Sequence, residues 1–589
     1  AEEISGVKYI DYLGSFYDYL NRVFSEIEEI NLYLDMERDR FQELQGISEN
    51  FSEEVKKRYP FVRIKNIFPK ISVKERNLMQ SFKSFLYFCR LSKVSVRSGY
   101  KGNLFSNTTT HGRFYNIKTR NMAKEYNPKN ANSILKHGEK LLGHSLRELH
   151  PEAIAPHGKG GLGEAVEEFH YGYKPNSVAE PDFKEAGLEL KCTPLKELKK
   201  DQSMAAKERL VLNIINYIEE AKETFETSSF WKKNKLLLLM FYLHVANVNP
   251  VDLVFKLIRK WKFPKDDLKI IKDDWNIIHS KILHGQAQEL SEGDTFYLAA
   301  CMKGSKAKED MRDQPGTNER AQQRAYSLKT GYMNTIILDS FLDEGINHQL
   351  NITPKRLEKL QKKFASDKIV KSLRCYKPKE TFEQLVIRRV ESFYGKTVEK
   401  IGKKRKVKLN VKAKDLAYNV CRAIFNIKTR KIQEFENANI SLKTIVLEAN
   451  RDKIIESMSF PYIRFVDIIN EEWEDSEWHK QLSGKFLFVV FRKSPDGDKR
   501  KMKLVKVFFW NMPYNDLVEA KNLWEDTKQK VCNGDYDHFI TSKANGICHV
   551  RPHGTKGQTV LTSQGNRVQP KCFWLNNDYI LNIVLNELN

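Results

Sequence analysis

The chain has few of the features that would mark a secreted scaffold or a membrane protein. Its eight cysteines are scattered over 589 residues, with no C-x-x-C pair and no cysteine–histidine spacing typical of a zinc site. This pattern excludes a disulfide framework and indicates reduced thiols, as in a cytoplasmic protein. The best apolar run, 236–242, has only the length of a strand, so neither a membrane span nor a membrane partner is predicted.

Acidic side chains are also in deficit. Lysine and arginine number 99 against 76 aspartates and glutamates, which gives a net charge of +23. Such an excess is expected of a protein that binds a polyanion, although ribosomal and membrane-surface proteins are equally basic. Hydrophobic residues make up 41% of the chain, which is enough for sizeable cores and excludes wholesale disorder. The length predicts several domains.

The most informative motif is PDFKEAGLELK, residues Pro181–Lys191. Because side chains alternate along a strand, Glu189 and Lys191 share one face. A hairpin through Gly187 brings Asp182 back beside Glu189. Two converging carboxylates form a site for a hard cation such as Mg2+, and the lysine beyond them can hold an attacking water. These are the groups that metal-assisted cleavage of a phosphodiester requires.

The string alone is a weak signal, and a solvated hairpin with a surface ion pair is the plain alternative. Upstream, the glycine-rich stretch 157–163 opens a predicted helix. It lacks the spacing of a Walker loop or a dinucleotide fingerprint, so a flexible helix entry explains it equally well. Glu167 and Glu168 follow on this helix, and either one is close enough in sequence to complete a carboxylate cluster with Asp182.

The stretch Gly160–Leu195 resembles the nuclease core shared by the mismatch-repair nicking enzyme MutH and the GATC-specific restriction endonuclease of the Sau-three-A-one type. Further runs resemble that restriction enzyme in particular: 207–217, 225–230, 288–293, 323–329 and 470–477. The resemblance extends from about residue 131 to the C-terminus. It implies an α/β fold of tandem MutH-like mixed-sheet domains, a mostly helical N-terminal domain, and Mg2+-dependent cleavage of double-stranded DNA at GATC.

The resemblance also implies roles for individual residues. It assigns metal binding to Asp182, Glu189 and the Leu190 carbonyl, and catalysis to these carboxylates, Lys191, Glu167 (with Glu168 as the alternative) and Lys233. Simple solvation is the alternative for Lys233 and for Arg551. The DNA contacts implied are Lys303, Gly304, Arg324, Ser327, Arg551 and Pro552. Ser327 stands near the position where the mismatch-repair relative carries a tyrosine linked to adenine-methyl sensing, and this departure leaves methylation sensitivity open.

A diverged internal repeat is predicted, because four segments recur in the same order. The pairs are 141–149 with 393–401, 182–192 with 434–444, 275–285 with 524–534, and 326–332 with 573–579. The predicted domains are 1–130, a catalytic copy at 131–355 and a second copy at 380–589. In the second copy Ser441 replaces Glu189 and Cys421 lies near the place of Glu167, while Glu434 and Lys443 remain. We expect this copy to be inactive and to bind DNA as a regulatory site.

Residues 1–130 lie outside the resemblance. An apolar stripe from 16 to 44 predicts an amphipathic helix, either a coiled coil or a helix packed on its own domain. The basic, aromatic stretch 93–129 either extends the DNA contact or is a solvated connector. The basic run 403–406 is either a solvated face or a phosphate contact. A restriction enzyme would act as a monomer or a DNA-induced dimer beside a cognate methyltransferase; a nicking enzyme and a non-cleaving DNA sensor are the rival hypotheses.

Overall fold

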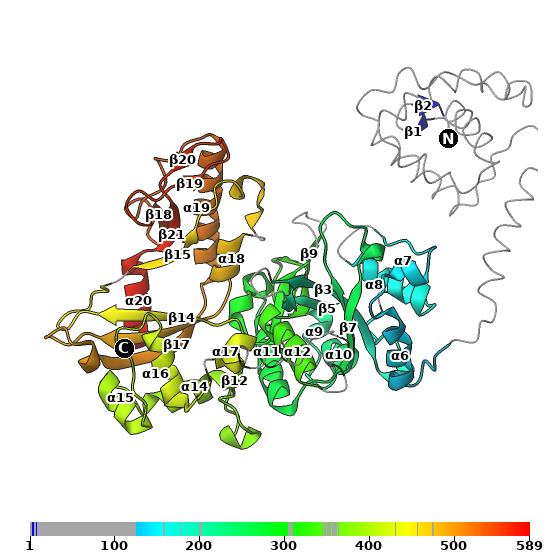
Figure 1. Ribbon diagram of the computed structural model, residues 1–589, viewed down its shortest axis with the longest axis horizontal. Helices are drawn as coiled ribbons and strands as arrows, with labels where there is room; N and C mark the ends of the chain where they lie inside the picture. The colour runs from blue at the N-terminus through cyan, green and yellow to red at the C-terminus, as the bar shows by residue number, and fades with distance from the viewer. Residues whose placement is uncertain are drawn as a thin grey trace, which may run out of the picture. The chain divides into compact units, whose positions relative to one another are not determined.

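The computed structural model describes residues 125–589 and two short N-terminal strands, β1 (Glu3–Ile4) and β2 (Val7–Lys8), which pair antiparallel (Figure 1). Within 125–589 it leaves out 157–159, 177, 199–202, 304–309, 344–345, 347–348, 350–354, 356–357, 359–361, 363–364, 430, 456, 474–475 and 589. The chain divides into two compact units, Ala1–Asn121 and Met122–Asn589. The predicted helix at 16–44 and most of the basic stretch 93–129 lie outside the described residues.

The first copy of the repeat is a mixed α/β unit with one four-stranded and one three-stranded sheet. Its elements are α6 (Ala131–Gly138), η3 (Glu139–Leu141), α7 (Leu146–Leu149), α8 (Gly161–Ala165), η4 (Val166–His170), η5 (Lys184–Ala186), β3 (Glu189–Glu197), β4 (Met204–Ala206), β5 (Leu210–Ile214), α9 (Tyr217–Glu220), α10 (Ser229–Asn234), β6 (Leu237–Leu243), η6 (Pro250–Asp252), β7 (Phe255–Trp261), α11 (Lys265–Leu283), η7 (Ala287–Glu289), η8 (Glu292–Asp294), β8 (Leu298–Met302), β9 (Met311–Arg312), β10 (Ala321–Gln322), β11 (Arg324–Leu328) and α12 (Thr330–Leu342).

The second copy repeats this order of elements, apart from β4, after the connection 343–381. The connection and copy contain β12 (Ser366–Asp367), η11 (Leu373–Cys375), α14 (Phe382–Glu391), α15 (Val398–Arg405), α16 (Leu416–Phe425), β13 (Lys431–Ile432), α17 (Gln433–Asn437), β14 (Ser441–Leu447), β15 (Met458–Tyr462), η12 (Ile468–Asn470), α18 (Glu477–Leu482), β16 (Phe486–Arg492), η14 (Lys499–Lys501), β17 (Lys503–Trp510), α19 (Tyr514–Cys532), β18 (Cys548–Pro552), β19 (Val560–Leu561), β20 (Arg567–Val568), β21 (Lys571–Leu575) and α20 (Asn577–Leu588).

Within the described residues the two copies share their sheet topology, except that β4 of the first copy has no counterpart in the second. In the first, β3 pairs parallel with β6, and β6 pairs antiparallel with β7; in the second, β14, β16 and β17 do the same. The second sheets also correspond, with orders β5-β11-β8 and β15-β21-β18. These mixed sheets confirm the predicted fold class. The apolar run 236–242, which was assigned the length of a strand from the sequence, is present as β6.

Equivalent backbone contacts show which residues of the two copies correspond. Gly143 has a φ of +81° and donates its N–H to the carbonyl of Phe255, while Gly395 has a φ of +73° and donates to Leu504. The left-handed conformation explains why glycine occupies both turns. These contacts align 141–149 with 393–401, as the sequence repeat predicted.

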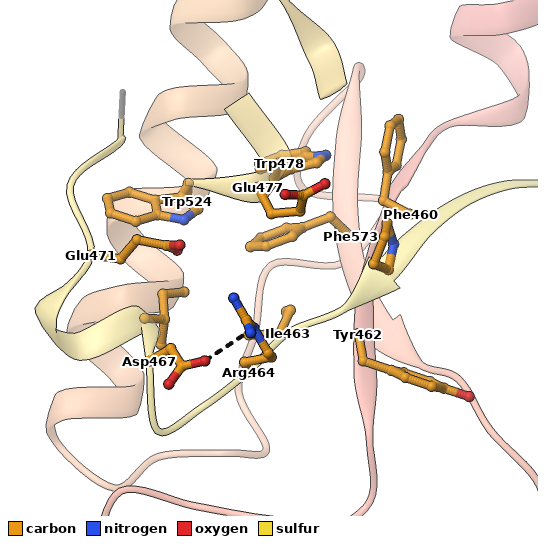
Figure 2. A pocket seen from close by; sticks show the side chains of 12 residues that line it. Phe460, Tyr462, Ile463, Arg464, Asp467, Glu471, Glu477, Trp478, Trp524 and Phe573 are labelled. Carbon is orange, nitrogen blue, oxygen red and sulfur yellow. Dashed lines mark ion pairs between the residues drawn. The ribbon is translucent and has the colours of Figure 1, made fainter. Parts of the chain in front are cut away.

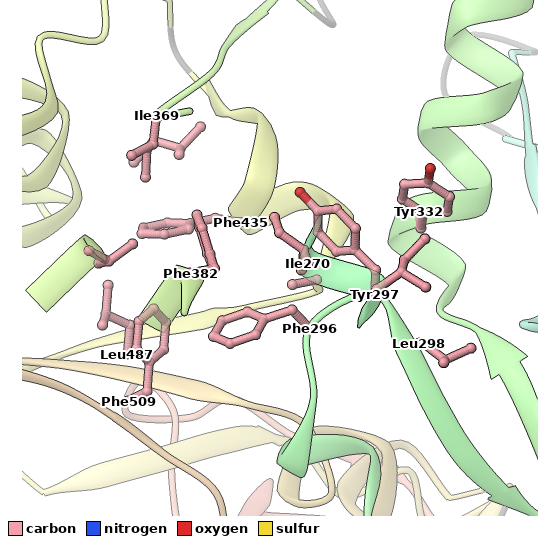
Figure 3. Packing of buried hydrophobic residues seen from close by; sticks show 14 of the residues in the cluster. Ile270, Phe296, Tyr297, Leu298, Tyr332, Ile369, Phe382, Phe435, Leu487 and Phe509 are labelled. Atoms are coloured by element: carbon pink, nitrogen blue, oxygen red, sulfur yellow. The ribbon is translucent and has the colours of Figure 1, made fainter. Parts of the chain in front are cut away.

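The two copies share one hydrophobic core, in which both sets of side chains interdigitate (Figure 3). The ring of Phe296 from the first copy meets Phe382 and Phe509 of the second edge-on, at centroid distances of 5.0 and 5.2 Å. Helix α12 also packs against α17, where a Cβ added to Gly331 would lie 2.1 Å from the Glu436 carbonyl oxygen. The two copies therefore pack directly against each other through side chains of both.

The sequence also predicted reduced cysteines and no membrane span. All seven cysteines in the described part of the chain are free. Among the described residues no helix combines the length and the apolar character that crossing a bilayer requires.

Candidate active site

The site begins with a hairpin that the local sequence dictates. Phe183 and Leu188 exchange two backbone hydrogen bonds of 3.0 and 3.3 Å, and Gly187 closes the turn with a φ of +59°. Within this hairpin Oδ2 of Asp182 accepts the N–H of Leu190 at 2.8 Å, and the N–H of Asp182 donates to Oε2 of Glu189 at 3.2 Å. The predicted approach of the two carboxylate residues is present in the structure.

Two lysines complete the polar cluster around Glu189, which is 1% exposed. Nζ of Lys191, on the same strand β3, donates to Oε1 of Glu189 at 2.6 Å. Nζ of Lys233 lies 3.5 Å from the same oxygen and donates to the Val178 carbonyl at 3.2 Å. Lys233 comes from helix α10. The ammonium groups of both lysines thus lie next to the same buried carboxylate, that of Glu189.

Helix geometry decides between the two glutamates that the sequence left open. Residues Val166–His170 form a π-helical turn, which accommodates one extra residue in a helix. The pKa of Glu167 is raised to about 8, first by burial and then by the negative charge of Asp182, with Lys191 opposing. Glu168 is exposed. Glu167 is therefore the glutamate that this turn directs toward the cluster.

Crowding of negative charge is the main electrostatic property of the site. Burial raises the pKa of Asp182 to about 7, the charge of Glu189 adds to the rise, and Lys191 opposes it. Three carboxylates that perturb one another in a partly buried place are typical of functional sites. A bound cation would relieve this repulsion.

The side chains fit a Mg2+ ion in their chemistry. Mg2+ takes oxygen ligands and is usually held by one or two protein carboxylates, with water and substrate phosphate completing the shell. Asp182 and Glu189 supply such a pair, next to the backbone of Leu190. Among the described residues no group of three or more His, Cys, Asp or Glu side chains is placed to hold a metal ion by itself.

Tyr173 is a site residue that sequence reasoning missed. Its N–H donates to the Glu167 carbonyl at 3.1 Å, and its ring lies edge-on to Phe183 at 5.4 Å. Its hydroxyl is buried and has no hydrogen-bond partner among the described residues. Burial raises the pKa of this hydroxyl, and Asp182, Glu167 and Glu189 raise it further. Its position three residues after the π turn could not be recognised as special from sequence alone.

The residues of the first copy that were predicted to contact DNA differ in their exposure. Lys303 is exposed at the end of β8, and Gly304 lies outside the described residues. Arg324 is 6% exposed, and its guanidinium donates to the carbonyls of Ala287, Ala300 and Gln288. Ser327 is fully buried and donates to the Ala299 carbonyl. Burial and internal bonding do not support direct DNA contact for Arg324 and Ser327, because both side chains hold β11 in its sheet.

In the second copy Arg551 and Pro552 are exposed, but the cluster of carboxylates and lysines is not repeated. Arg551 and Pro552 end strand β18 at the surface, and the guanidinium of Arg551 lies 3.7 Å above the ring of Trp574. Stacking of this kind fixes an arginine while leaving its N–H groups free for a base edge. This geometry is compatible with base reading.

Glu434, the acidic residue that remains in the second copy, has a structural role. Glu434 is 3% exposed and accepts the N–H groups of Ile369 and Val370 at 2.9 and 2.8 Å. Ser441 begins β14 where Glu189 begins β3, and Lys443 lies 5.2 Å from the ring centroid of Phe460. Burial lowers the pKa of Lys443. This set of groups offers no pair of free carboxylates.

A small aromatic cavity lies beside Phe460 in the same copy (Figure 2). Its volume is about 50 Å³, and Trp478, Trp524 and Phe573 are among its walls. Arg464 at its edge is paired with Asp467 at 3.0 Å. This volume has room for about one or two waters.

Fold and site together define the class of protein. A hairpin carboxylate, a strand Glu-x-Lys and a helix glutamate, assembled on a mixed sheet, form a nuclease-type site. The family model of the DNA mismatch repair enzyme MutH matches residues 171–274 and 424–522. It therefore matches the chain twice, once within each copy, in agreement with the tandem topology.

Comparison with curated proteins identifies the family. The type II restriction enzyme Sau3AI of Staphylococcus aureus is 34% identical over 477 residues, which cover 74% of this chain and 91% of that enzyme. The DNA mismatch repair proteins MutH of Vibrio campbellii and Shewanella woodyi are each 22% identical over 227 and 231 residues, covering 37% of this chain and 96% of each relative. The chain belongs to the MutH/Sau3AI family and is a nuclease of that family.

Proposed function

We propose that the protein is a type II restriction endonuclease that cleaves double-stranded DNA at GATC by Mg2+-dependent hydrolysis. The observation that carries the proposal is the hairpin that sets Asp182 beside Glu189, with Lys191 bonded to the latter at 2.6 Å. Similarity to an enzyme named as a type II restriction enzyme over 91% of its length supports the same activity here. Such an enzyme would work in the cytoplasm beside a cognate methyltransferase, as a monomer or a DNA-induced dimer.

Each side chain of the cluster has a distinct task in this proposal. Asp182, Glu189 and the Leu190 carbonyl would hold Mg2+, which supplies charge stabilisation at the scissile phosphate and an acidified water. Lys191 releases its bond to Glu189 and orients the attacking water. Lys233, within reach of the same carboxylate, balances charge as the phosphate enters.

Tyr173 and Glu167 form the inner wall of the proposed site. The unpartnered hydroxyl of Tyr173 donates to a phosphate oxygen, which satisfies a donor that is otherwise buried without a bond. Glu167, with its pKa near 8 before any cation binds, gives up its proton as the cation enters. The carboxyl groups of the site are therefore all ionised only when the cation is bound.

For the second copy we propose a regulatory site that binds GATC without cutting it. The buried Glu434, the serine at 441 and the buried Cys421 leave no pair of carboxylates for an ion. The exposed Arg551 on Trp574 is the candidate reader of guanine. Helix α17, which directly precedes β14, packs on α12 of the catalytic copy. Binding at one copy can thus bias the arrangement of the other.

Supercoiled plasmid carrying GATC sites tests the activity. With Mg2+ the wild type is expected to give linear product, and Asp182→Asn to leave the plasmid supercoiled. Nicked product would favour the mismatch-repair type of enzyme, and binding without any cleavage would favour a DNA sensor. For regulation, a short uncleavable GATC duplex is added to a one-site substrate. Faster cleavage is expected, and an unchanged rate at all duplex concentrations would remove the regulatory role.

A further inference from the structure

Three helices of the second copy enclose a pocket rich in arginine. Helix α14 supplies Arg388, Arg389 and Ser392, α15 supplies Arg405, and the end of α16 supplies Ile424–Asn426. The cavity has a volume of about 380 Å³. It contains none of the groups proposed above to cut or read DNA.

The positive charge in this pocket is only partly neutralised. Arg388 forms a two-pronged ion pair with Glu380, at 2.5 and 2.8 Å. Arg389 donates to the Ile369 carbonyl at 2.8 Å, and no carboxylate lies within ion-pair distance of Arg389 or Arg405 in the described part of the chain. A half-buried guanidinium without a counter-charge is unfavourable unless an anion joins it.

Arg405 supplies a second, independent sign of a missing ligand. Its Nε is buried and has no hydrogen-bond partner among the described residues. Its guanidinium lies 4.8 Å from the ring centroid of Phe393, which holds the side chain in one orientation. An oriented fork of N–H donors is the arrangement by which arginine binds phosphate.

The first copy shows that the fold does not need an arginine at the position of Arg389. Counting from Gly143 and Gly395 puts Arg389 at the position of His137, and counting from the positive-φ residues Gly172 and Asn426 puts Ile424 at His170. The rings of His137 and His170 stack at 4.4 Å. Each ring meets the other residue's carbonyl, at 2.9 and 3.0 Å.

Both rings also have a neighbour outside the pair: Nε2 of His150 lies 3.0 Å from Nδ1 of His170, and a carboxylate oxygen of Glu125 lies 3.9 Å from Nδ1 of His137. Burial lowers the pKa of His170 to about 3 and also lowers that of His137. The second copy has Arg389 and Ile424 at the two positions of this pair, and Arg389 lines the open pocket.

We propose that this arginine pocket binds a phosphate group, with Arg405 and Arg389 as its principal donors. Phosphate is the chemistry shared by the DNA backbone and by a free nucleotide, and the volume admits either a backbone segment or a mononucleotide. Arg464 also lies at the edge of a cavity, but its charge is already neutralised by Asp467.

Arg405→Gln is the primary test variant, because Arg405 makes no ion pair in the described part of the chain. Arg464→Gln, which removes the same charge from a neutralised surface site of the same copy, is the matched control. Binding of a fluorescent GATC duplex is measured in EDTA, so that no cleavage occurs, between 50 and 200 mM salt, on the order of the range over which such contacts are resolved. Binding of inorganic phosphate and thymidine monophosphate is measured by calorimetry at constant ionic strength.

If the pocket holds a backbone phosphate, Arg405→Gln weakens duplex binding roughly 10-fold and lowers the salt slope by about 1, while the control stays like wild type. If it holds a free phosphate, wild type and control bind the small anions and Arg405→Gln loses them roughly 10-fold, with duplex binding unchanged. Arg405→Lys, which keeps the charge but loses the fork, is expected to restore less than half of the lost free energy. Identical binding of every probe by Arg405→Gln, control and wild type would overturn the proposal.

Discussion

Replacing Asp182 by asparagine should stabilise the metal-free protein at alkaline pH. The asparagine Oδ1 can still accept the Leu190 N–H, so the hairpin keeps its bond. What disappears is an ionised carboxylate whose pKa is raised from 3.8 to about 7, by burial first and then by Glu189. A carboxylate with a raised pKa costs folding free energy whenever it is ionised in the folded state.

The size of the effect follows from the shift. About 3 pKa units at 1.36 kcal/mol each give about 4 kcal/mol, and partial solvent screening of this half-buried side chain reduces it to about 2 kcal/mol. Below pH 3.8 both states are protonated and the variant gains nothing. As pH rises from about 4 to 7 the wild type loses stability while the variant does not. Above pH 7 the difference is constant.

Thermal unfolding in EDTA measures this difference. At pH 8 we expect the Tm of Asp182→Asn to exceed that of the wild type by about 2–4 °C, and the gap to close toward pH 4. Adding Mg2+ should raise the Tm of the wild type much more than that of the variant, because the ion binds only the folded, intact site. A variant less stable than wild type at pH 8, or a gap independent of pH, would refute the reasoning.

Three more predictions follow from the same geometry. Tyr173→Phe should slow cleavage about 10- to 100-fold, which corresponds to the loss of one hydrogen bond to a charged group. The Tm should stay unchanged or rise, because the removed hydroxyl has no hydrogen-bond partner in the described fold. A fall in Tm that accompanies the loss of rate would instead mean a structural role. Gly331→Ala should destabilise by about 1–3 kcal/mol in urea titrations, opposite to the gain that Ala normally gives a helix, because the new Cβ meets the Glu436 carbonyl. The apparent affinity for Mg2+ should rise with pH between about 6 and 8 as the carboxylates near pKa 7 and 8 lose their protons, and Glu167→Gln should flatten the upper part of this titration.

Short-range features of the site were predictable from sequence. The hairpin through Gly187 is encoded by a turn residue and strand alternation within eleven positions, so Asp182, Glu189 and Lys191 could be grouped correctly. The choice between Glu167 and Glu168 was not predictable, because it depends on a π turn that absorbs one residue. Only the structure gives that turn.

Long-range features were not predictable. Arg324 and Ser327 looked like DNA contacts by position, but pairing of β11 with β5 and β8 buries both. The division into catalytic and regulatory domains is still a prediction, although the topology repeats as the sequence echo indicated. The interdigitation of both copies around Phe296 was not expected, because periodicity reports which residues are buried but not which partner buries them.

The most direct measurement compares two matched lysines. Lys191→Met and Lys443→Met occupy equivalent positions on β3 and β14, one beside a buried carboxylate and the other against Phe460. Cleavage of a GATC duplex should fall at least about 100-fold for Lys191→Met and stay within about 3-fold of wild type for Lys443→Met in the presence of saturating Mg2+, a margin below 1 kcal/mol. Comparable losses in both variants, or full activity in Lys191→Met, would contradict the assignment of catalysis to the first copy alone.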